Sequence, residues 1–203
     1  MQDKHGRRIH SMRISVTDRC NMRCSYCVSG DKLQLKPRDE LLTLEEIETI
    51  IQAATMIGFD AFRFTGGEPL VRRGLVKLIT RVSRLHGIRK LSLSTNGSLL
   101  APNVAALQDA GVRHLNISLD TLKADRFKEV TRGGNLASVL DGIRTALATN
   151  AFNIKLNTVV MRGVNEDELC DLAAMTLENS LSVRFIEYMP YGNWQGCGGG
   201  SGV

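Results

Sequence analysis

The chain has 203 residues, of which 43% are hydrophobic and 23% are charged, a balance typical of one globular domain. It contains no apolar run long enough to span a membrane, and its first residues lack the apolar centre of a signal peptide. We therefore expect a soluble protein of the cytoplasm, or of the mitochondrial matrix in a eukaryote. The formal net charge is +5, but the basic residues are scattered and aromatic side chains make up only 5%. This pattern argues against a nucleic-acid-binding protein.

Strands and helices are expected to alternate along the chain. The expected strands cover residues 13–17, 61–65, 90–95, 114–119, 154–160 and 182–189. The expected helical stretches cover residues 43–57, 72–86, 102–111, 123–150 and 166–177, and residues 28–42 form a polar connector. Alternation of this kind favours parallel strands with right-handed crossovers. We expect an α/β fold, a partial (β/α)6 barrel, over residues 1–190, and a disordered glycine-rich tail over residues 191–203.

The ends of two expected helices carry recognisable signals. Thr43 with Glu46 and Asn165 with Glu168 each match a capping box, in which the two side chains satisfy free amides at a helix start. Gly58 is placed to end the first of these helices in a left-handed conformation. Cys170 is expected to be a thiol packed within the last helix, and it is assigned no function.

Side chains alternate across each strand, so their parity sorts them into two faces. The apolar face, which must meet the helices, comprises Ile14, Val16, Phe62, Phe64, Leu91, Leu93, Leu115, Ile117, Leu119, Ile154 and Leu156. The opposite face, which lines the interior, comprises Arg13, Ser15, Thr17, Arg63, Thr65, Ser92, Ser94, Asn96, Asn116, Ser118, Asp120, Lys155 and Asn157. A polar interior indicates a polar ligand. The cations Arg13, Arg63 and Lys155 indicate an anion such as a triphosphate, because buried cations without counter-charges are costly. The sixth strand does not sort by parity.

Cys20, Cys24 and Cys27 form a C-x3-C-x2-C motif in the loop after the first strand. Cysteine thiolates hold iron–sulfur clusters, and three of them would leave one iron of a four-iron cluster open to a small molecule. A zinc site is an alternative, although structural zinc sites usually have four protein ligands. Redox-active or incidental thiols are a further alternative.

Gly66-Gly67-Glu68-Pro69 directly follows the second expected strand. Glycines at a strand end let a ligand approach the backbone and leave amide groups available to it. Glu68 can accept hydrogen bonds from an ammonium group. A tight turn without a ligand is the structural alternative.

The cysteine motif, with an aromatic residue directly before its third cysteine, resembles the signature of the radical S-adenosylmethionine (SAM) enzymes. The resemblance implies that Cys20, Cys24 and Cys27 hold a [4Fe-4S] cluster whose open iron binds SAM. It also implies that Tyr26 contacts the adenine region of SAM. An electron from the cluster then cleaves SAM into methionine and a 5′-deoxyadenosyl radical. Residues 66–69 resemble the loop that holds the methionine amino group in this superfamily.

Six segments in order further resemble the GTP 3′,8-cyclase family of molybdenum-cofactor biosynthesis. They are residues 17–21 (TDRCN), 63–70 (RFTGGEPL), 94–97 (STNG), 116–120 (NISLD), 160–165 (VMRGVN) and 184–190 (RFIEYMP). The substrate contacts that this resemblance implies are Arg13, Arg63, Ser94 and Lys155, with Arg13 and Lys155 in catalytic roles. The SAM contacts that it implies are Tyr26, Gly66, Gly67, Glu68, Ser118 and Met189. Its implied partners are GTP, an electron donor such as a flavodoxin or ferredoxin, and a second copy of the chain.

The chain departs from this family pattern at two places. The family carries a C-terminal extension with a second cysteine cluster that binds the guanine end, and Cys197 alone cannot rebuild it. Val28-Ser29 stands where Met-Pro is typical. From this departure we expect that the chain alone cleaves SAM slowly, couples cleavage poorly to cyclisation, and discriminates weakly between GTP and ATP.

Overall fold

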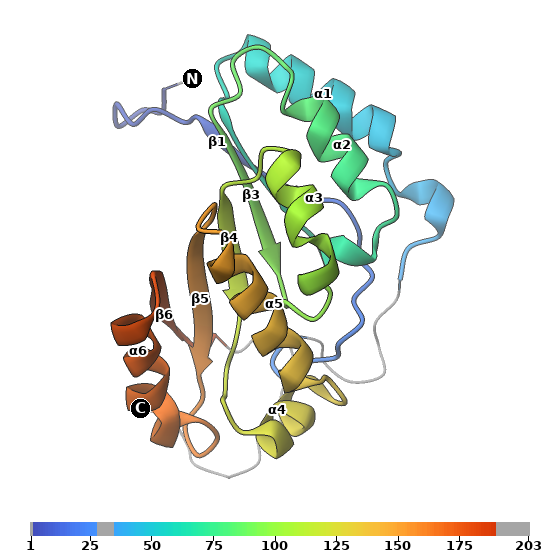
Figure 1. The fold of residues 1–203 in the computed structure, drawn as a ribbon. Helices are drawn as coiled ribbons and strands as arrows, with labels where there is room; N and C mark the ends of the chain where they lie inside the picture. The colour runs from blue at the N-terminus through green and yellow to red at the C-terminus, as the bar shows by residue number, and fades with distance from the viewer. Residues whose placement is uncertain (1, 28–34, 190–203) are drawn as a thin grey trace.

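The computed structural model describes residues 2–27 and 35–189. Its six strands form one parallel sheet in chain order, β1 to β6, which confirms the expected α/β architecture of a partial barrel (Figure 1). The strands are β1 (Ser11–Ser15), β2 (Ala61–Thr65), β3 (Lys90–Thr95), β4 (His114–Ser118), β5 (Asn153–Val160) and β6 (Leu181–Glu187). The expected tail, Val28-Ser29 and Cys197 lie outside the described residues.

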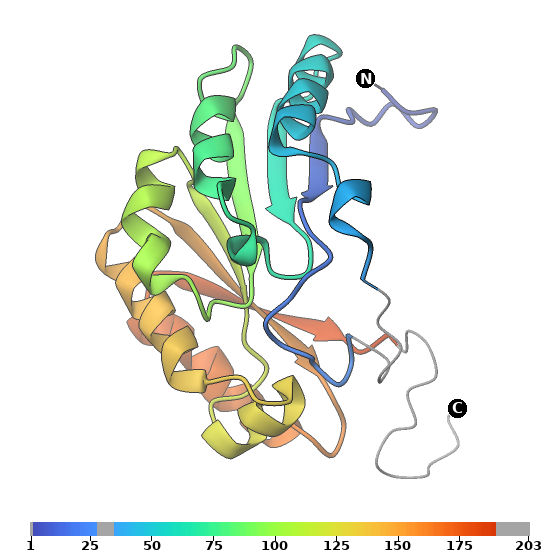
Figure 2. The ribbon, with the colours of Figure 1, turned by 90° about the vertical axis from the view of Figure 1, so that its right-hand side faces the viewer.

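The helices lie along one side of the curved sheet (Figure 2). They are α1 (Leu44–Met56), α2 (Leu75–Val82), α3 (Val104–Asp109), α4 (Ala124–Thr131), α5 (Leu136–Ala148) and α6 (Leu169–Glu178). Short 3-10 helices are η2 (Arg38–Glu40), η3 (Pro69–Val71), η4 (Ala101–Asn103) and η5 (Glu166–Glu168). Because all six strands are parallel, each ends at the same edge of the sheet, and the loops at that edge can build one site.

Parity predicted correctly which side chains of the sheet meet the helices. Phe64, Leu93, Leu115, Ile117 and Leu156 are completely buried in one core cluster. Removing apolar surface of this size from water is the main stabilising term for the sheet–helix contact. The opposite face of the sheet is free to form a lumen.

Two of the expected helices differ from their predicted bounds. Within residues 72–86, Gly74 has a φ of 84° and α2 begins only after it. Within residues 123–150, the chain breaks between α4 and α5, where Arg132 and Gly133 have φ values of 54° and 111°. Left-handed conformations end a helix, and Asn135 begins α5 by accepting a hydrogen bond from the amide of Ala137.

The first capping box is confirmed. The hydroxyl of Thr43 accepts a hydrogen bond from the Glu46 amide at 3.1 Å, and Glu46 Oε2 accepts one from the Thr43 amide at 2.7 Å. Gly58 follows α1 with a φ of 97°, in the left-handed conformation that its position predicted.

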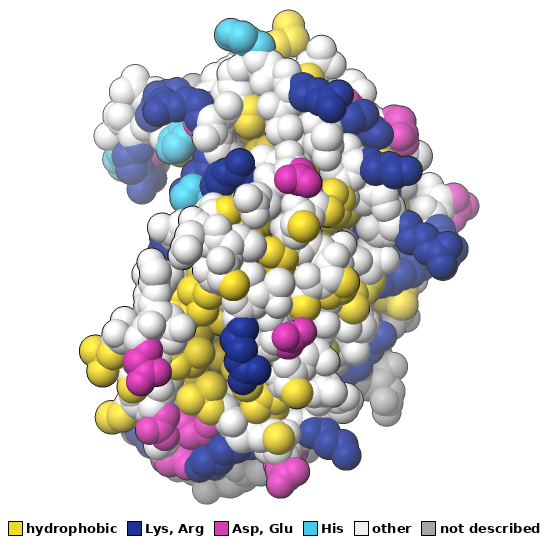
Figure 3. Space-filling model, viewed as in Figure 1, with side chains coloured by type: hydrophobic (Ala, Val, Ile, Leu, Met, Phe, Trp, Pro, Cys, Tyr) yellow, Lys and Arg dark blue, Asp and Glu magenta, His cyan; other side chains and the backbone are white. Residues whose placement is uncertain are grey.

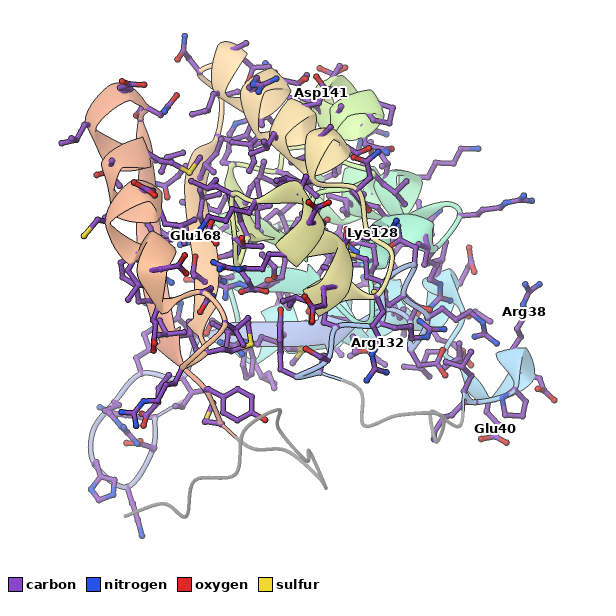
Figure 4. The ribbon with its side chains drawn as sticks, turned by 90° about the horizontal axis from the view of Figure 1, so that it is seen from below. Arg38, Glu40, Lys128, Arg132, Asp141 and Glu168 are labelled. Atoms are coloured by element: carbon purple, nitrogen blue, oxygen red, sulfur yellow. The ribbon has the colours of Figure 1, made fainter. Side chains whose placement is uncertain are left out.

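The second capping box is wrong. Asn165 does not cap a helix: its Oδ1 accepts from the Met161 amide, and its Nδ2 donates to the carbonyls of Asp120 and Val159. Glu168 is also turned inward, between α6 and α4 (Figure 4). Both side chains form hydrogen bonds with backbone groups near the ends of strands. A capping pattern in the sequence does not reveal these distant partners.

Glu168 is 1% exposed and ties two loops together. Its Oε1 accepts from the Thr121 hydroxyl at 2.6 Å and its Oε2 from the Leu122 amide at 2.7 Å, and it pairs with Arg126. The loop after β4 is thus held against the start of α6.

The surface agrees with the expected scatter of charge. Lys and Arg side chains are dispersed over the helical face, with Asp and Glu side chains among them (Figure 3). Cys170 is exposed on α6, so the expectation of a packed thiol is wrong: it lies on the solvent side of the helix that buries Leu172. No helix within the described residues has the length and apolar character needed to cross a membrane.

Candidate active site

The three cysteines of the motif lie in the loop that leaves β1 at the carboxyl edge of the sheet. Two backbone hydrogen bonds hold this loop against the end of α4: the amide of Arg23 donates to the Thr131 carbonyl at 3.1 Å, and that of Ser25 to the Val130 carbonyl at 2.8 Å. The Cys27 amide donates to the Cys24 carbonyl at 3.0 Å. The loop is therefore anchored through its backbone.

The three thiols are close enough to influence one another. Burial raises the pKa of the Cys24 thiol to about 12, with further increases from Asp120, Cys27 and Cys20. Burial also raises the pKa of the Cys27 thiol, with a contribution from Cys20. Binding a metal centre here requires that the thiols lose their protons.

The donor chemistry of this loop fits an iron–sulfur cluster. Three thiols are present, Cys170 lies away on α6, and thiolates are the usual ligands of such clusters. Within residues 2–27 and 35–189, no three His, Cys, Asp or Glu side chains are arranged as a closed metal site. The three thiols share one loop, but in this arrangement they do not converge as a ligand set.

A buried contact joins the cysteine loop to the ends of β4 and β5. The Tyr26 hydroxyl donates to Asp120 Oδ2 at 2.7 Å, and Asp120 Oδ1 accepts from the Val159 amide at 2.8 Å. Burial raises the pKa of both the Tyr26 phenol and the Asp120 carboxyl. Asp120 thus positions Tyr26 directly beside the thiols.

The lumen of the sheet carries the cations that parity predicted, but they are not deeply buried. Arg13 is exposed, and Arg63 and Lys155 are half-buried. The expectation that all three cations are buried is therefore wrong, although they lie on the predicted face. The reason is that the lumen is open: among the described residues, β1 pairs only with β2 and β6 only with β5.

The same face holds a further cation, Arg184, which sequence parity missed. Arg184 on β6 is in register with Asn157 on β5, so it shares the face of Lys155. Burial lowers the pKa of Arg63, with further decreases from Arg13 and Arg184. Burial also lowers the pKa of Lys155, followed by the effects of Arg184, Lys90 and Arg63. These cations repel one another and favour a shared anion.

Comparison with known proteins decides the family. The model of the radical SAM superfamily matches residues 14–176, which is most of the chain. The chain belongs to the radical SAM superfamily. The matched residues include the C-x3-C-x2-C loop, which lies at the carboxyl edge of the parallel sheet.

Curated relatives are similar over nearly the whole chain. A protein named GTP 3′,8-cyclase from Pelotomaculum thermopropionicum is 52% identical over 193 residues, which are 95% of this chain and 59% of the relative. Another of that name from Geobacter sulfurreducens is 49% identical over 196 residues, 95% of this chain and 60% of the relative. The chain thus spans about 60% of the length of these relatives.

Solved structures with low identity share the fold. Streptococcus suis SuiB bound to its precursor peptide SuiA has a TM-score of 0.74 at 18% identity, covering 88% of this chain and 39% of SuiB. The protein anSMEcpe with bound AdoMet has a TM-score of 0.70 at 18% identity, covering 89% of this chain and 52% of that protein. The radical SAM fold of the chain is therefore supported by sequence and by structure.

The glycine-rich loop of this radical SAM chain contacts the cysteine loop through its backbone. The Gly67 amide donates to the Thr17 carbonyl at 2.7 Å, and the Glu68 amide to the Arg19 carbonyl at 2.8 Å. The expectation that these amides stay available to a ligand is wrong, because the cysteine loop uses them. The glycines allow the backbones of the two loops to approach closely.

Glu68 is completely buried and acts within the protein. Its Oε1 accepts from the Leu70 amide at 3.0 Å and from the Thr95 hydroxyl at 2.8 Å, and its Oε2 accepts from the Asn96 amide at 2.6 Å. Asn96 in turn lies 3.8 Å from the Cys20 sulfur through its Nδ2. Glu68 therefore positions the end of β3 beside the cysteine loop, and its role as a SAM ligand stays a prediction.

The remaining predicted contacts lie around the lumen and its carboxyl edge. Ser94 on β3 is half-buried and in register with Asn116, and Ser118 ends β4 and is exposed. Met189 follows β6 and is 68% exposed. Their contacts with substrate or SAM, like those of Gly66 and Gly67, stay predictions.

Replacing Tyr26 by phenylalanine tests the contact between the cysteine loop and the sheet. The change removes one hydrogen bond from a buried carboxyl group, so we expect the free energy of unfolding to fall by about 1–2 kcal/mol. Urea unfolding of Tyr26→Phe, Asp120→Asn and the double variant measures the coupling between the two side chains. Strictly additive effects would show that the hydroxyl and the carboxyl group do not interact.

Proposed function

We propose that the whole protein converts GTP into (8S)-3′,8-cyclo-7,8-dihydroguanosine 5′-triphosphate by radical SAM chemistry. Relatives that are 52% and 49% identical carry the name of this activity. One observation carries the proposal: three adjacent thiols lie at the carboxyl edge of a sheet whose lumen holds cations. An oxygen-sensitive one-electron centre and a polyanionic substrate would then occupy neighbouring parts of one site.

Cys20, Cys24 and Cys27 would hold a [4Fe-4S] cluster. When bound, the cluster supplies the electron that cleaves SAM and the open iron that SAM requires. Tyr26 and Asn96 flank the thiols, and Asp120 keeps Tyr26 in place. Together with the predicted contacts of Gly66, Gly67, Glu68, Ser118 and Met189, they would orient SAM.

Arg13, Arg63, Lys155 and Arg184 would bind the triphosphate, and Ser94 would contact the nucleotide nearer the thiols. Arginine and lysine form charge-assisted hydrogen bonds with phosphate oxygens. Holding the nucleotide at one end fixes the distance between its ribose and the thiols, and orientation of this kind lowers a reaction barrier by several kcal/mol. Arg13 and Lys155 are thus proposed to act by placing the substrate.

The chemistry requires an external reductant. We propose that a flavodoxin or a ferredoxin delivers the electron and that the reaction takes place in the cytoplasm. A homodimer is the assembly that we propose for the whole protein.

A second candidate is a metal-stabilised binding module in which the three cysteines hold zinc. The raised pKa of Cys24 and Cys27 does not favour zinc over a cluster, because both centres bind deprotonated thiols. Anaerobic reconstitution with iron and sulfide, followed by an assay for 5′-deoxyadenosine with dithionite and SAM, separates the two.

We expect the reconstituted chain to form 5′-deoxyadenosine and Cys24→Ala to form none. Cys170→Ala is the matched control, because Cys170 is exposed on α6 and should leave cluster content and SAM cleavage unchanged. Stoichiometric zinc without 5′-deoxyadenosine would support the binding module and refute the enzyme.

A further inference from the structure

The cations of the lumen continue toward its amino-terminal end, beyond those that the sequence predicted. Arg13, Arg63 and Ser92 are in register across β1, β2 and β3, and His114 on β4 is in register with Ser92. Parallel neighbours in register point to the same face, so His114 belongs to the row of Arg13 and Arg63. Lys90 lies two residues before Ser92 on β3 and shares that face.

Two adjoining cavities open at this end of the lumen, each of about 270 Å³. The first is lined by Arg13, Arg63 and Lys90, and the second by Lys90 and His114. Both are also lined by Ala61, whose small side chain is in register with Lys90 and leaves space beside it. The cations therefore border a space that a phosphate group can enter.

No carboxylate on the six strands neutralises these cations. The lumen-facing positions of the strands, all of which the structure describes, are Ser11, Arg13, Ser15, Ala61, Arg63, Thr65, Lys90, Ser92, Ser94, His114, Asn116, Ser118, Asn153, Lys155, Asn157, Val159, Ser182, Arg184 and Ile186. None is acidic. Among the described residues, moreover, Arg63, Lys90 and Lys155 form no ion pair with a carboxylate.

The carboxylate that borders the second cavity is already engaged. Asp60 Oδ1 lies 2.8 Å from His10 Nδ1, and its Oδ2 lies 3.1 Å from Arg8 and 3.8 Å from Arg89. Asp60 therefore pairs with Arg8, His10 and Arg89, and within the described residues it forms no ion pair with Lys90 or His114.

We propose that Lys90 and His114 hold the terminal phosphate of the substrate at the amino-terminal end of the lumen, so that the site selects a nucleoside triphosphate over a monophosphate. The proposal rests on the proposed function and adds two specificity-determining residues to it. A lysine donates to phosphate oxygens as a point charge, and a histidine donates through a ring N–H and adds positive charge when it is protonated.

The length of the lumen fits this placement. Parallel strands rise about 3.3 Å per residue, so Lys90 and Asn96 lie about 20 Å apart along β3. Asn96 contacts the Cys20 sulfur at one end, and Lys90 borders the cavities at the other. An elongated nucleotide would therefore have its phosphates at Lys90 and its sugar toward the thiols.

Lys90→Met tests the proposal, because methionine keeps the length of the side chain and removes its charge. We expect the Kd for GTP to rise about tenfold, the effect of one charged hydrogen bond, while the Kd for GMP stays unchanged. Lys77→Met is the matched control: Lys77 is exposed on α2, and its loss changes the net charge equally but should change neither Kd. Equal losses for GTP and GMP, or no loss for GTP, would overturn the proposal.

His114 supplies a second readout that a structural role would not produce. Burial lowers the pKa of His114, followed by the effects of Lys90, Lys155 and Arg63. The other charged or titratable groups around its cavity are Arg8, His10, Asp60 and Arg89. Because phosphates would offset these cations, GTP binding should raise this pKa and take up protons near pH 7. Calorimetry in two buffers with different ionisation enthalpies should show less proton uptake for His114→Gln than for the unmodified chain, and equal uptake would contradict the proposal.

Inorganic tripolyphosphate distinguishes this inference from the proposed function. If tripolyphosphate binds and Lys90→Met weakens it about tenfold, the anion site exists whatever its natural ligand. In that case a failure of GTP to compete with tripolyphosphate would refute the proposed substrate and leave the anion site standing. Binding of GTP that is indifferent to Lys90 would refute the inference and leave the proposed substrate standing.

Discussion

Replacing Gly67 by alanine should displace the cysteine loop and prevent assembly of its metal centre. A Cβ atom at this position would lie 2.3 Å from the Arg19 carbonyl oxygen and 2.5 Å from its carbon. These are backbone atoms of the cysteine loop, so they cannot rotate away as a side chain would. We expect the free energy of unfolding to fall by about 1–3 kcal/mol, as for other overpacked sites, and the iron content after reconstitution to drop below half. Thermal unfolding and iron analysis measure the two effects.

Gly163→Ala is the control for this substitution. Gly163 has a φ of 71°, so alanine is strained there, but no heavy atom lies within 4 Å of the added Cβ. We expect Gly163→Ala to lower the stability somewhat, because of its φ. The iron content after reconstitution should not change, because the added Cβ meets no other atom and Gly163 is distant in the chain from the cysteine loop. Equal iron content in Gly67→Ala and Gly163→Ala would show that the two loops do not depend on their close approach.

Glu168→Ala should be the most destabilising of the side-chain changes considered. Glu168 is 1% exposed and accepts hydrogen bonds from the Thr121 hydroxyl and the Leu122 amide. It also pairs with Arg126. Truncation leaves buried donors without an acceptor, and breaking a buried pair in this way commonly costs about 3–5 kcal/mol. A urea unfolding curve measures the change through its midpoint at constant slope.

Glu166→Ala provides the comparison for Glu168→Ala. Glu166 lies in the same 3-10 helix and carries the same charge, but its side chain is exposed. Surface substitutions of this kind usually change the unfolding free energy by less than about 0.5 kcal/mol. A Glu168→Ala variant as stable as Glu166→Ala would mean that the loop after β4 is not held by this carboxylate.

The sequence predicted the sheet well because its signals are periodic. Alternating apolar residues such as Phe62, Phe64, Leu91 and Leu93 identified both the strands and the face that meets the helices, and the core confirms it. Helix ends were harder to predict. Asn165 and Glu168 match a capping box, but burial at the ends of β4 and β5 gives them other partners. Tertiary hydrogen bonds overrode a local pattern there.

In the site, too, features set by nearby residues were predicted, and features set by contacts between distant residues were not. The spacing of Cys20, Cys24 and Cys27 was enough to predict that they lie near one another, because all three belong to one short loop. Arg184 was missed because its face depends on its register with Asn157. The close approach of Gly67 to the Arg19 backbone was not foreseen, because the two residues are distant in the chain. Strand register and loop-to-loop contacts become visible only in the folded chain.

Mössbauer spectroscopy of the chain reconstituted with 57Fe, before and after addition of SAM, tests the central claim most directly. If Cys20, Cys24 and Cys27 hold a four-iron cluster with one iron open, four irons bind per chain and the signal of one of the four changes when SAM is added. The same change should be absent in Cys24→Ala. A spectrum that SAM leaves unchanged, or a protein that retains zinc instead of iron, would contradict the account.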